Sequence, residues 1–165
     1  WIKDNGTMEQ KSKQRWVMMA VVLLLLGGGL SGYLLNGAGS ETITQLPLVE
    51  GCQLDQKGCS ATLPNGTVMQ FEMTPKPLPT TEPIQMRASF SAGIPERVEV
   101  LFEGRDMYMG FLQYRLKPTA EVGVYQGKGS LSICTRRLMA WIAKVRVTQN
   151  GETVEIPFAF ETLHL

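Results

Sequence analysis

Sulfur-bearing side chains are the residues of this 165-residue chain whose types and spacing could do chemistry. Met107 and Met109 stand two residues apart, so an extended backbone would project both thioethers from one face. Cys134 follows later in the chain and adds a thiol. Because thioether and thiolate sulfur select copper(I) over harder ions, these three residues predict a weak copper(I) site. Core packing is the alternative interpretation of the methionine pair, since methionine is a flexible core filler.

The alternation around this pair bears on its exposure. A strand predicted over residues 107–116 would place Tyr108, Leu112, Tyr114 and Leu116 on one face and Met107, Met109, Phe111, Gln113 and Arg115 on the other. The second set ends in polar residues, so we expect it to face solvent. A bulge at Gly110 would exchange the two faces.

Groups for acid–base or nucleophilic catalysis are scarce. The single histidine, His164, stands next to the C-terminal residue, where a chain end usually frays, so any Ser-His-Asp or Cys-His arrangement would depend on that position. Gly127-Lys-Gly-Ser130 lacks the upstream glycine spacing of a phosphate loop and is interpreted as a strand bend or bulge. The chain also lacks a CxxC pair and zinc-ligand spacing. We therefore expect a protein that is not an enzyme.

An uninterrupted apolar stretch of 20 residues, 16–35, is long enough to cross the ~30 Å hydrocarbon core of a bilayer as a helix. Four Lys/Arg residues precede it and none occurs in the 20 residues that follow, so the positive-inside rule places residues 1–15 in the cytoplasm and the rest across the membrane. The alternative is a cleaved signal peptide with Gly37-Ala38-Gly39 as its cleavage site, although such a peptide normally has only ~7–15 apolar residues.

Residues 36–44 are small and polar and are expected to form a tether, and residues 45–165 are enough for one domain with a single core. From residue 36 onward, twelve Lys/Arg face thirteen Asp/Glu, which leaves no basic patch for nucleic acid. All three cysteines fall on the translocated side, where disulfides persist. Cys52 and Cys59 enclose six residues, and we expect them to pair, although the sequence leaves pairing with Cys134 open.

Short alternating runs bounded by Gly, Pro and Asn predict an all-β domain. About eight strands are expected from nine candidate segments, at 45–49, at 61–63 and 68–73 around a type I′ turn at Asn65-Gly66, and at 84–91, 97–103, 107–116, 123–132, 140–149 and 153–161. Met69, Met73 and Met86 are expected in the core. Because no helical pattern intervenes, the predicted fold is an immunoglobulin-like antiparallel β-sandwich preceded by one transmembrane helix.

Segments 100–116, 127–134 and 139–141 resemble a group of bacterial single-span proteins that have a small β domain outside the inner membrane and accompany cytochrome oxidase and copper-delivery proteins. The resemblance implies an accessory role in oxidase assembly, with Met107, Met109 and Cys134 as the positions to test. The chain lacks the paired cysteines of thioredoxin-like copper-delivery proteins and the Cys-Phe-Cys segment of membrane-anchored copper-insertion proteins, so it is neither. It also lacks the histidine-rich ends of periplasmic copper carriers, which argues against a copper(II) site.

Two functions are therefore expected from the sequence. The first is a non-enzymatic accessory protein, anchored in the bacterial inner membrane with its C-terminal domain in the periplasm, that supports respiratory oxidase assembly through weak copper(I) handling. The alternative is a structural module without metal that presents a sheet edge or loop to an inner-membrane or periplasmic protein. In both, residues 16–35 bind the lipid bilayer.

Overall fold

The computed structural model describes residues 15–19, 21, 22, 42–108, 110–132 and 136–163, and the chain divides into two units, Trp1–Ser40 and Glu41–Leu165. In the first unit, residues 15–19, 21 and 22 are helical. Most of the predicted membrane span, 16–35, lies outside the described residues. Among the helices in the described ranges, none combines the length and the apolar character that crossing a bilayer requires.

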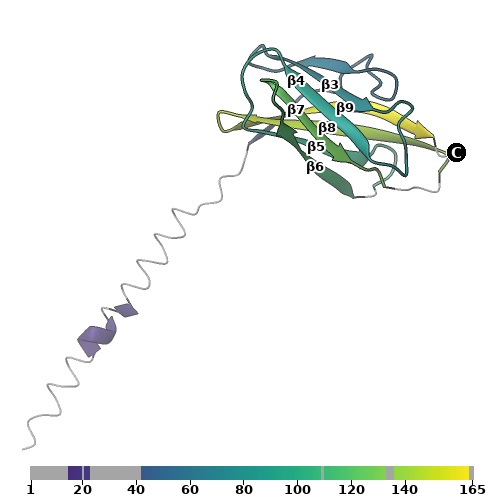
Figure 1. Ribbon diagram of the computed structural model, residues 1–165. Helices are drawn as coiled ribbons and strands as arrows, with labels where there is room; N and C mark the ends of the chain where they lie inside the picture. Colours follow the sequence, from purple (N-terminus) through teal and green to yellow (C-terminus); the bar gives the residue numbers. More distant parts are fainter. Residues whose placement is uncertain (1–14, 20, 23–41, 109, 133–135, 164–165) are drawn as a thin grey trace, which may run out of the picture. The chain divides into compact units, whose positions relative to one another are not determined.

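The second unit is a curled sheet of nine strands (Figure 1). The strands are β1 Ile43–Gln45, β2 Cys59–Thr62, β3 Val68–Thr74, β4 Ile84–Phe90, β5 Arg97–Gly104, β6 Phe111–Pro118, β7 Val124–Gly129, β8 Leu138–Gln149 and β9 Glu152–Leu163. Their order across the sheet is β1-β9-β8-β5-β6-β7-β4-β3-β2. The all-β prediction is confirmed, with nine strands rather than about eight. Neighbouring strands are antiparallel except β1 and β9, which are parallel.

Apolar side chains at every second position of the strands fill one core, as the alternating sequence predicts. In β3, Met69, Phe71 and Met73 are fully buried and alternate with exposed residues. Phe71 stacks on Phe158 of β9 with 5.9 Å between ring centroids. Strands near the two edges of the sheet therefore face each other across the core, and burial of their apolar side chains stabilises the curl.

The sheet turns back on itself at β6. This strand pairs with β5 from Phe111 to Leu116, but with β7 only at Lys117 and Pro118. Gly127 and Gly129 of β7 stay in register with β4, so the predicted bulge is absent. They instead leave room for side chains of β6, because a Cβ at Gly127 would lie 2.7 Å from Cδ2 of Leu116.

A disulfide closes the curled sheet from edge to edge. After β1, the chain runs along the outer side of β9 and donates backbone hydrogen bonds from Leu46 to Glu155, from Val49 to Pro157 and from Leu54 to Ala159. The predicted bond between Cys52 in this segment and Cys59 at the start of β2 is confirmed, with their Cα atoms 5.9 Å apart. It therefore joins the segment that covers β9 to the strand at the opposite edge.

The hairpin turn between β2 and β3 differs from the predicted type I′ turn. A type I′ turn needs positive φ at both central residues, and here Gly66 (φ +82°) has it but Asn65 does not. The Asn65 side chain instead accepts a hydrogen bond from the backbone N–H of Thr67 at 3.0 Å, which holds the turn without a left-handed asparagine. Positive φ at two consecutive residues occurs between β8 and β9, at Asn150 (53°) and Gly151 (78°).

The two ends of the domain are defined by β1 and β9. β1 begins at Ile43, inside the predicted tether, and pairs with Thr153 beside the β8–β9 turn; we call this the entry end. At the opposite end, which we call the far end, β8 begins at Leu138 beside Leu163 of β9. Gly104 at the end of β5 pairs with Trp141 of β8, so the connection from β5 to β6 also lies at the far end.

Candidate functional site

Of the three predicted copper ligands, Met109 and Cys134 lie outside the described residues, as does His164. Met107 is described. Its side chain is partly buried and packs against the hydrophobic core, whereas the neighbouring Tyr108 is 89% exposed. Met107 therefore does not project into solvent as the predicted outer face required.

A left-handed glycine explains this difference. β6 begins at Phe111 rather than at residue 107, directly after Gly110 with a φ of +75°. Within β6 the predicted faces are confirmed, since Phe111 is exposed and Leu116 is buried. Before Gly110 they are exchanged, which places Met107 on the core side.

Met107 and Met139 both lie next to Gly104 at the far end, Met107 through its backbone and Met139 through its side chain. A Cβ at Gly104 would lie 2.4 Å from the Met107 carbonyl oxygen and 2.9 Å from the Met139 methyl carbon. Both methionine residues thus approach one glycine, and Met139 is buried. Met69, Met73 and Met86 are buried as well, so their predicted place in the core is confirmed.

The charged groups on the outer face of β5, β8 and β9 form a network, in which Lys144 lies 2.8 Å from Glu103 and 3.8 Å from Glu155. Glu155 of β9 is only 2% exposed, and Arg146 donates to its carboxylate at 2.7 Å from Nε to Oε2. Gln45 of β1 donates to the other carboxylate oxygen at 3.3 Å. Across the described ranges, no three His, Cys, Asp or Glu residues lie close enough together to hold a metal ion. Glu155 therefore serves to attach β1 and β8 to β9.

Among the described residues, Lys76 and Tyr125 have shifted pKa values, and both have structural partners. Burial lowers the pKa of Lys76, against the opposing attraction of Asp55 and Glu72, and its Nζ donates to the Leu54 carbonyl oxygen at 2.9 Å. Burial raises the pKa of Tyr125, whose hydroxyl donates to the carbonyl oxygen of Pro95. Both groups therefore act as hydrogen-bond donors that connect separate segments of the fold.

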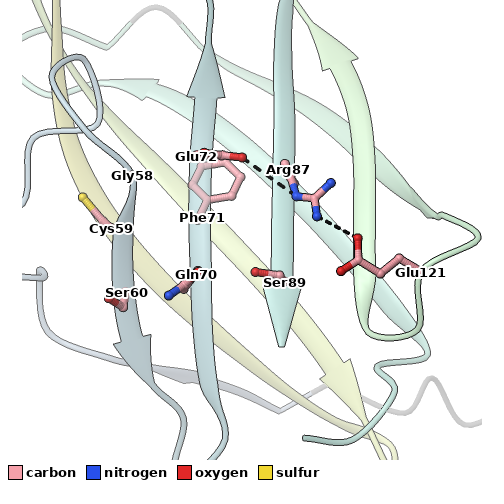
Figure 2. Close-up of a pocket in the computed structure, with 9 residues that line it drawn as sticks. All are labelled: Gly58, Cys59, Ser60, Gln70, Phe71, Glu72, Arg87, Ser89 and Glu121. Carbon is pink, nitrogen blue, oxygen red and sulfur yellow. Dashed lines mark hydrogen bonds and ion pairs between the residues drawn. The ribbon is translucent and has the colours of Figure 1, made fainter. Parts of the chain in front are cut away.

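A polar hollow of about 420 Å³ lies on the outer face of β2, β3 and β4. Figure 2 shows Arg87 at its centre, between two carboxylates. The guanidinium lies 2.9 Å from Glu121 Oε2 and 3.9 Å from Glu72 Oε1. Since two exposed carboxylates already compensate this cation, the hollow has little attraction for an anion.

An apolar groove of about 540 Å³ lies at the far end. It combines the proline-rich connection between β3 and β4 with the start of β8 and the end of β9. Of its leucines, Leu78 is buried, while Leu138 and Leu163 are 52% and 65% exposed. Exposed leucine side chains around a concave surface are typical of an interaction site.

No local sequence pattern predicts this groove, because its wall comes from four separate segments, residues 55, 77–82, 138 and 161–163. The register Leu138↔Leu163 could have been anticipated from the β8–β9 hairpin, because a two-residue turn fixes the pairing along the whole hairpin.

Comparisons of the chain with protein-family models, with curated proteins and with solved structures find no match.

Proposed function

We propose that this protein is a non-enzymatic interaction module of the bacterial cell envelope, anchored in the inner membrane by residues 16–35 with its C-terminal domain in the periplasm. The proposed fold is an immunoglobulin-like sandwich, supported by the contact between Phe71 and Phe158 across the core. The single observation that carries the proposal is the apolar groove at the far end. Tyr108 and Phe111 add exposed aromatic surface at the same end, and aromatic residues are enriched where proteins bind one another.

Site-specific photo-crosslinking in intact bacterial cells tests this function. A photoreactive benzoylphenylalanine replaces Leu138 beside the groove in one variant of the full chain, and Val122, which is exposed in the β6–β7 connection, in the matched control. We expect a discrete crosslinked protein from position 138 and none from position 122. Identical products from both positions, or none from either, would contradict the proposal.

Copper(I) handling in support of respiratory oxidase assembly is a second proposal, in which Met107, partly buried beside the hydrophobic core, is one ligand. Met109 and Cys134 complete the proposed ligand set, in which thioether and thiolate sulfur suit copper(I).

Titration of the full chain with copper(I), in competition with a chelator, tests the metal proposal. The Met107→Leu/Met109→Leu variant should bind at least about tenfold more weakly, because each substitution removes one soft ligand. Met86→Leu, in the core and of similar volume, is the control and should leave binding unchanged. Equal binding by all three proteins would sink the metal proposal without affecting the interaction proposal.

A further inference from the structure

We propose that the apolar groove at the far end binds an extended segment of a partner protein in which apolar side chains are flanked by Lys or Arg. This inference rests on the proposed interaction function and adds the chemistry of the partner.

The shape of the groove supports an apolar side chain as the central contact. A volume of about 540 Å³ falls in the range of pockets that enclose one small ligand, roughly 300–1,000 Å³. Leu78 is a buried lining residue, and the exposed Leu138 and Leu163 lie where strands β8 and β9 pair. Insertion of a leucine-sized side chain would remove these leucines from water, which favours binding.

The charges of the groove are all of one sign. The ionisable residues that line it are Asp55, Glu82 and Glu161, and none of the described lining residues is Lys or Arg. Arg136 and Arg137 precede Leu138 in the chain but are not among these lining residues. A partner with cations on both sides of its apolar residue is therefore the complementary one.

The three carboxylates are not equivalent. Asp55 accepts a hydrogen bond from the backbone N–H of Glu161 at 3.2 Å and lies near Lys76, so it also helps to hold the chain at the end of β9. The side chains of Glu82 and Glu161 form no ion pair with another residue in the described part of the domain. These two carboxylates are the positions at which charge can be removed with least effect on the fold.

Peptide binding to the full chain, reconstituted in nanodiscs of uncharged phosphatidylcholine, tests the proposal. The probes are three fluorescent hexapeptides, Lys-Ser-Leu-Leu-Ser-Lys, its charge-reversed form Glu-Ser-Leu-Leu-Ser-Glu, and Lys-Ser-Ser-Ser-Ser-Lys, with empty nanodiscs as the blank. We expect the first peptide to bind, and both others to bind at least about tenfold more weakly, because the groove requires apolar and charge complementarity together.

Variants then assign the binding to the groove. Leu138→Asp should weaken binding of the first peptide at least about tenfold, because the substitution places a carboxylate in the apolar wall of the groove. Ile94→Asp, at an equally accessible leucine-sized position in the β4–β5 connection, is the matched control and should have no effect. The Glu82→Gln/Glu161→Gln variant should bind the first peptide about two- to tenfold more weakly than the wild type at low salt. At high salt the two proteins should bind it equally, because exposed charges are screened.

Each outcome decides the partner chemistry separately from the interaction function. Equal or tighter binding of the charge-reversed peptide, absence of binding by all three, or equal losses from Leu138→Asp and Ile94→Asp would overturn the basic and apolar partner. A position-specific crosslink from residue 138 would in that case still support an interaction module, with a partner of different chemistry.

Discussion

The ring of Tyr114 in β6 lies against Gly129 in β7, so that a Cβ at position 129 would be 2.7 Å from the ring carbon Cδ2. The Tyr114 hydroxyl donates to the carbonyl oxygen of Ser130 at 2.8 Å, which fixes the ring in this position. The absence of a side chain at residue 129 thus permits β6 to pass close to β7 where the sheet turns back.

Substituting Gly129→Ala should destabilise the domain by about 1–3 kcal/mol, because the new methyl group cannot fit beside the tyrosine ring. Chemical denaturation, followed by fluorescence of the buried Trp141 in a Trp1→Phe/Trp16→Phe background, measures the free energy of unfolding. Lys128→Ala, at the exposed residue next to it, should change that free energy by less than about 0.5 kcal/mol. Repeating Gly129→Ala in a Tyr114→Ala background should remove most of its cost; an unchanged cost would contradict the assigned contact.

Loss of the edge-to-edge disulfide should lower the free energy of unfolding by about 2–3 kcal/mol, the loop-closure value for the short separation between Cys52 and Cys59. The Cys52→Ser/Cys59→Ser variant measures this change by the same denaturation. In denaturant, a thiol reagent should label one cysteine before reduction and three after it. Labelling of all three without reductant would show that the bond does not form.

The Tyr125 hydroxyl predicts a pH dependence at high pH. Its pKa is raised by burial above the ordinary value of 10.0, so the unfolded chain loses this proton first. The folded state then binds more protons than the unfolded state, and stability falls as pH rises from 10.0 through the raised pKa. At neutral pH, Tyr125→Phe should lower the free energy of unfolding by about 0.5–1.5 kcal/mol, because the hydrogen bond to Pro95 is lost. Above pH 10, the free energy of unfolding of this variant should fall less steeply with pH than that of the wild type. Parallel declines would refute this assignment.

The carboxylate of Glu155 connects three strands, and its removal should be costly. We expect Glu155→Gln to lower the free energy of unfolding by about 1–3 kcal/mol, because the buried acceptor of the Arg146 hydrogen bond loses its negative charge. The exposed Glu121, which pairs with Arg87, is the comparison, and Glu121→Gln should cost at most about 1 kcal/mol. If chemical denaturation gave equal losses of stability for Glu155→Gln and Glu121→Gln, burial would not determine the contribution of Glu155.

The local pattern of the sequence predicted most strands, because each strand carries its own evidence in the alternation of apolar residues. Val98, Val100 and Phe102 are buried in β5 as their spacing predicts. The parallel pairing of β1 with β9 was not predicted, since it joins residues about 110 positions apart and depends on no local signal. The predicted type I′ turn at Asn65 was wrong for a local reason. The Asn65 side chain accepts a hydrogen bond from the backbone of Thr67, and this holds the turn without positive φ at Asn65.

The candidate site was less predictable than the fold. The strand predicted from residue 107 begins only at Phe111, and the left-handed Gly110 changes which side Met107 faces. Copper binding by these residues and Cys134 stays a prediction. The apolar groove depends on Leu78, brought to the ends of β8 and β9 by the connection between β3 and β4, and such a meeting follows from tertiary packing rather than from any single stretch of sequence.

The bond between Cys52 and Cys59 also gives the domain a mechanical property. Tension on the chain before Ile43 would first load the parallel β1–β9 ladder, and then the backbone bonds of Leu46 and Val49. At Cys52 the force passes through the sulfur atoms to β2, so residues 53–58 between the two cysteines carry no load. The disulfide therefore acts as a stop that limits extension to the nine residues of segment 43–51, about 30 Å of slack, before the core strands are pulled.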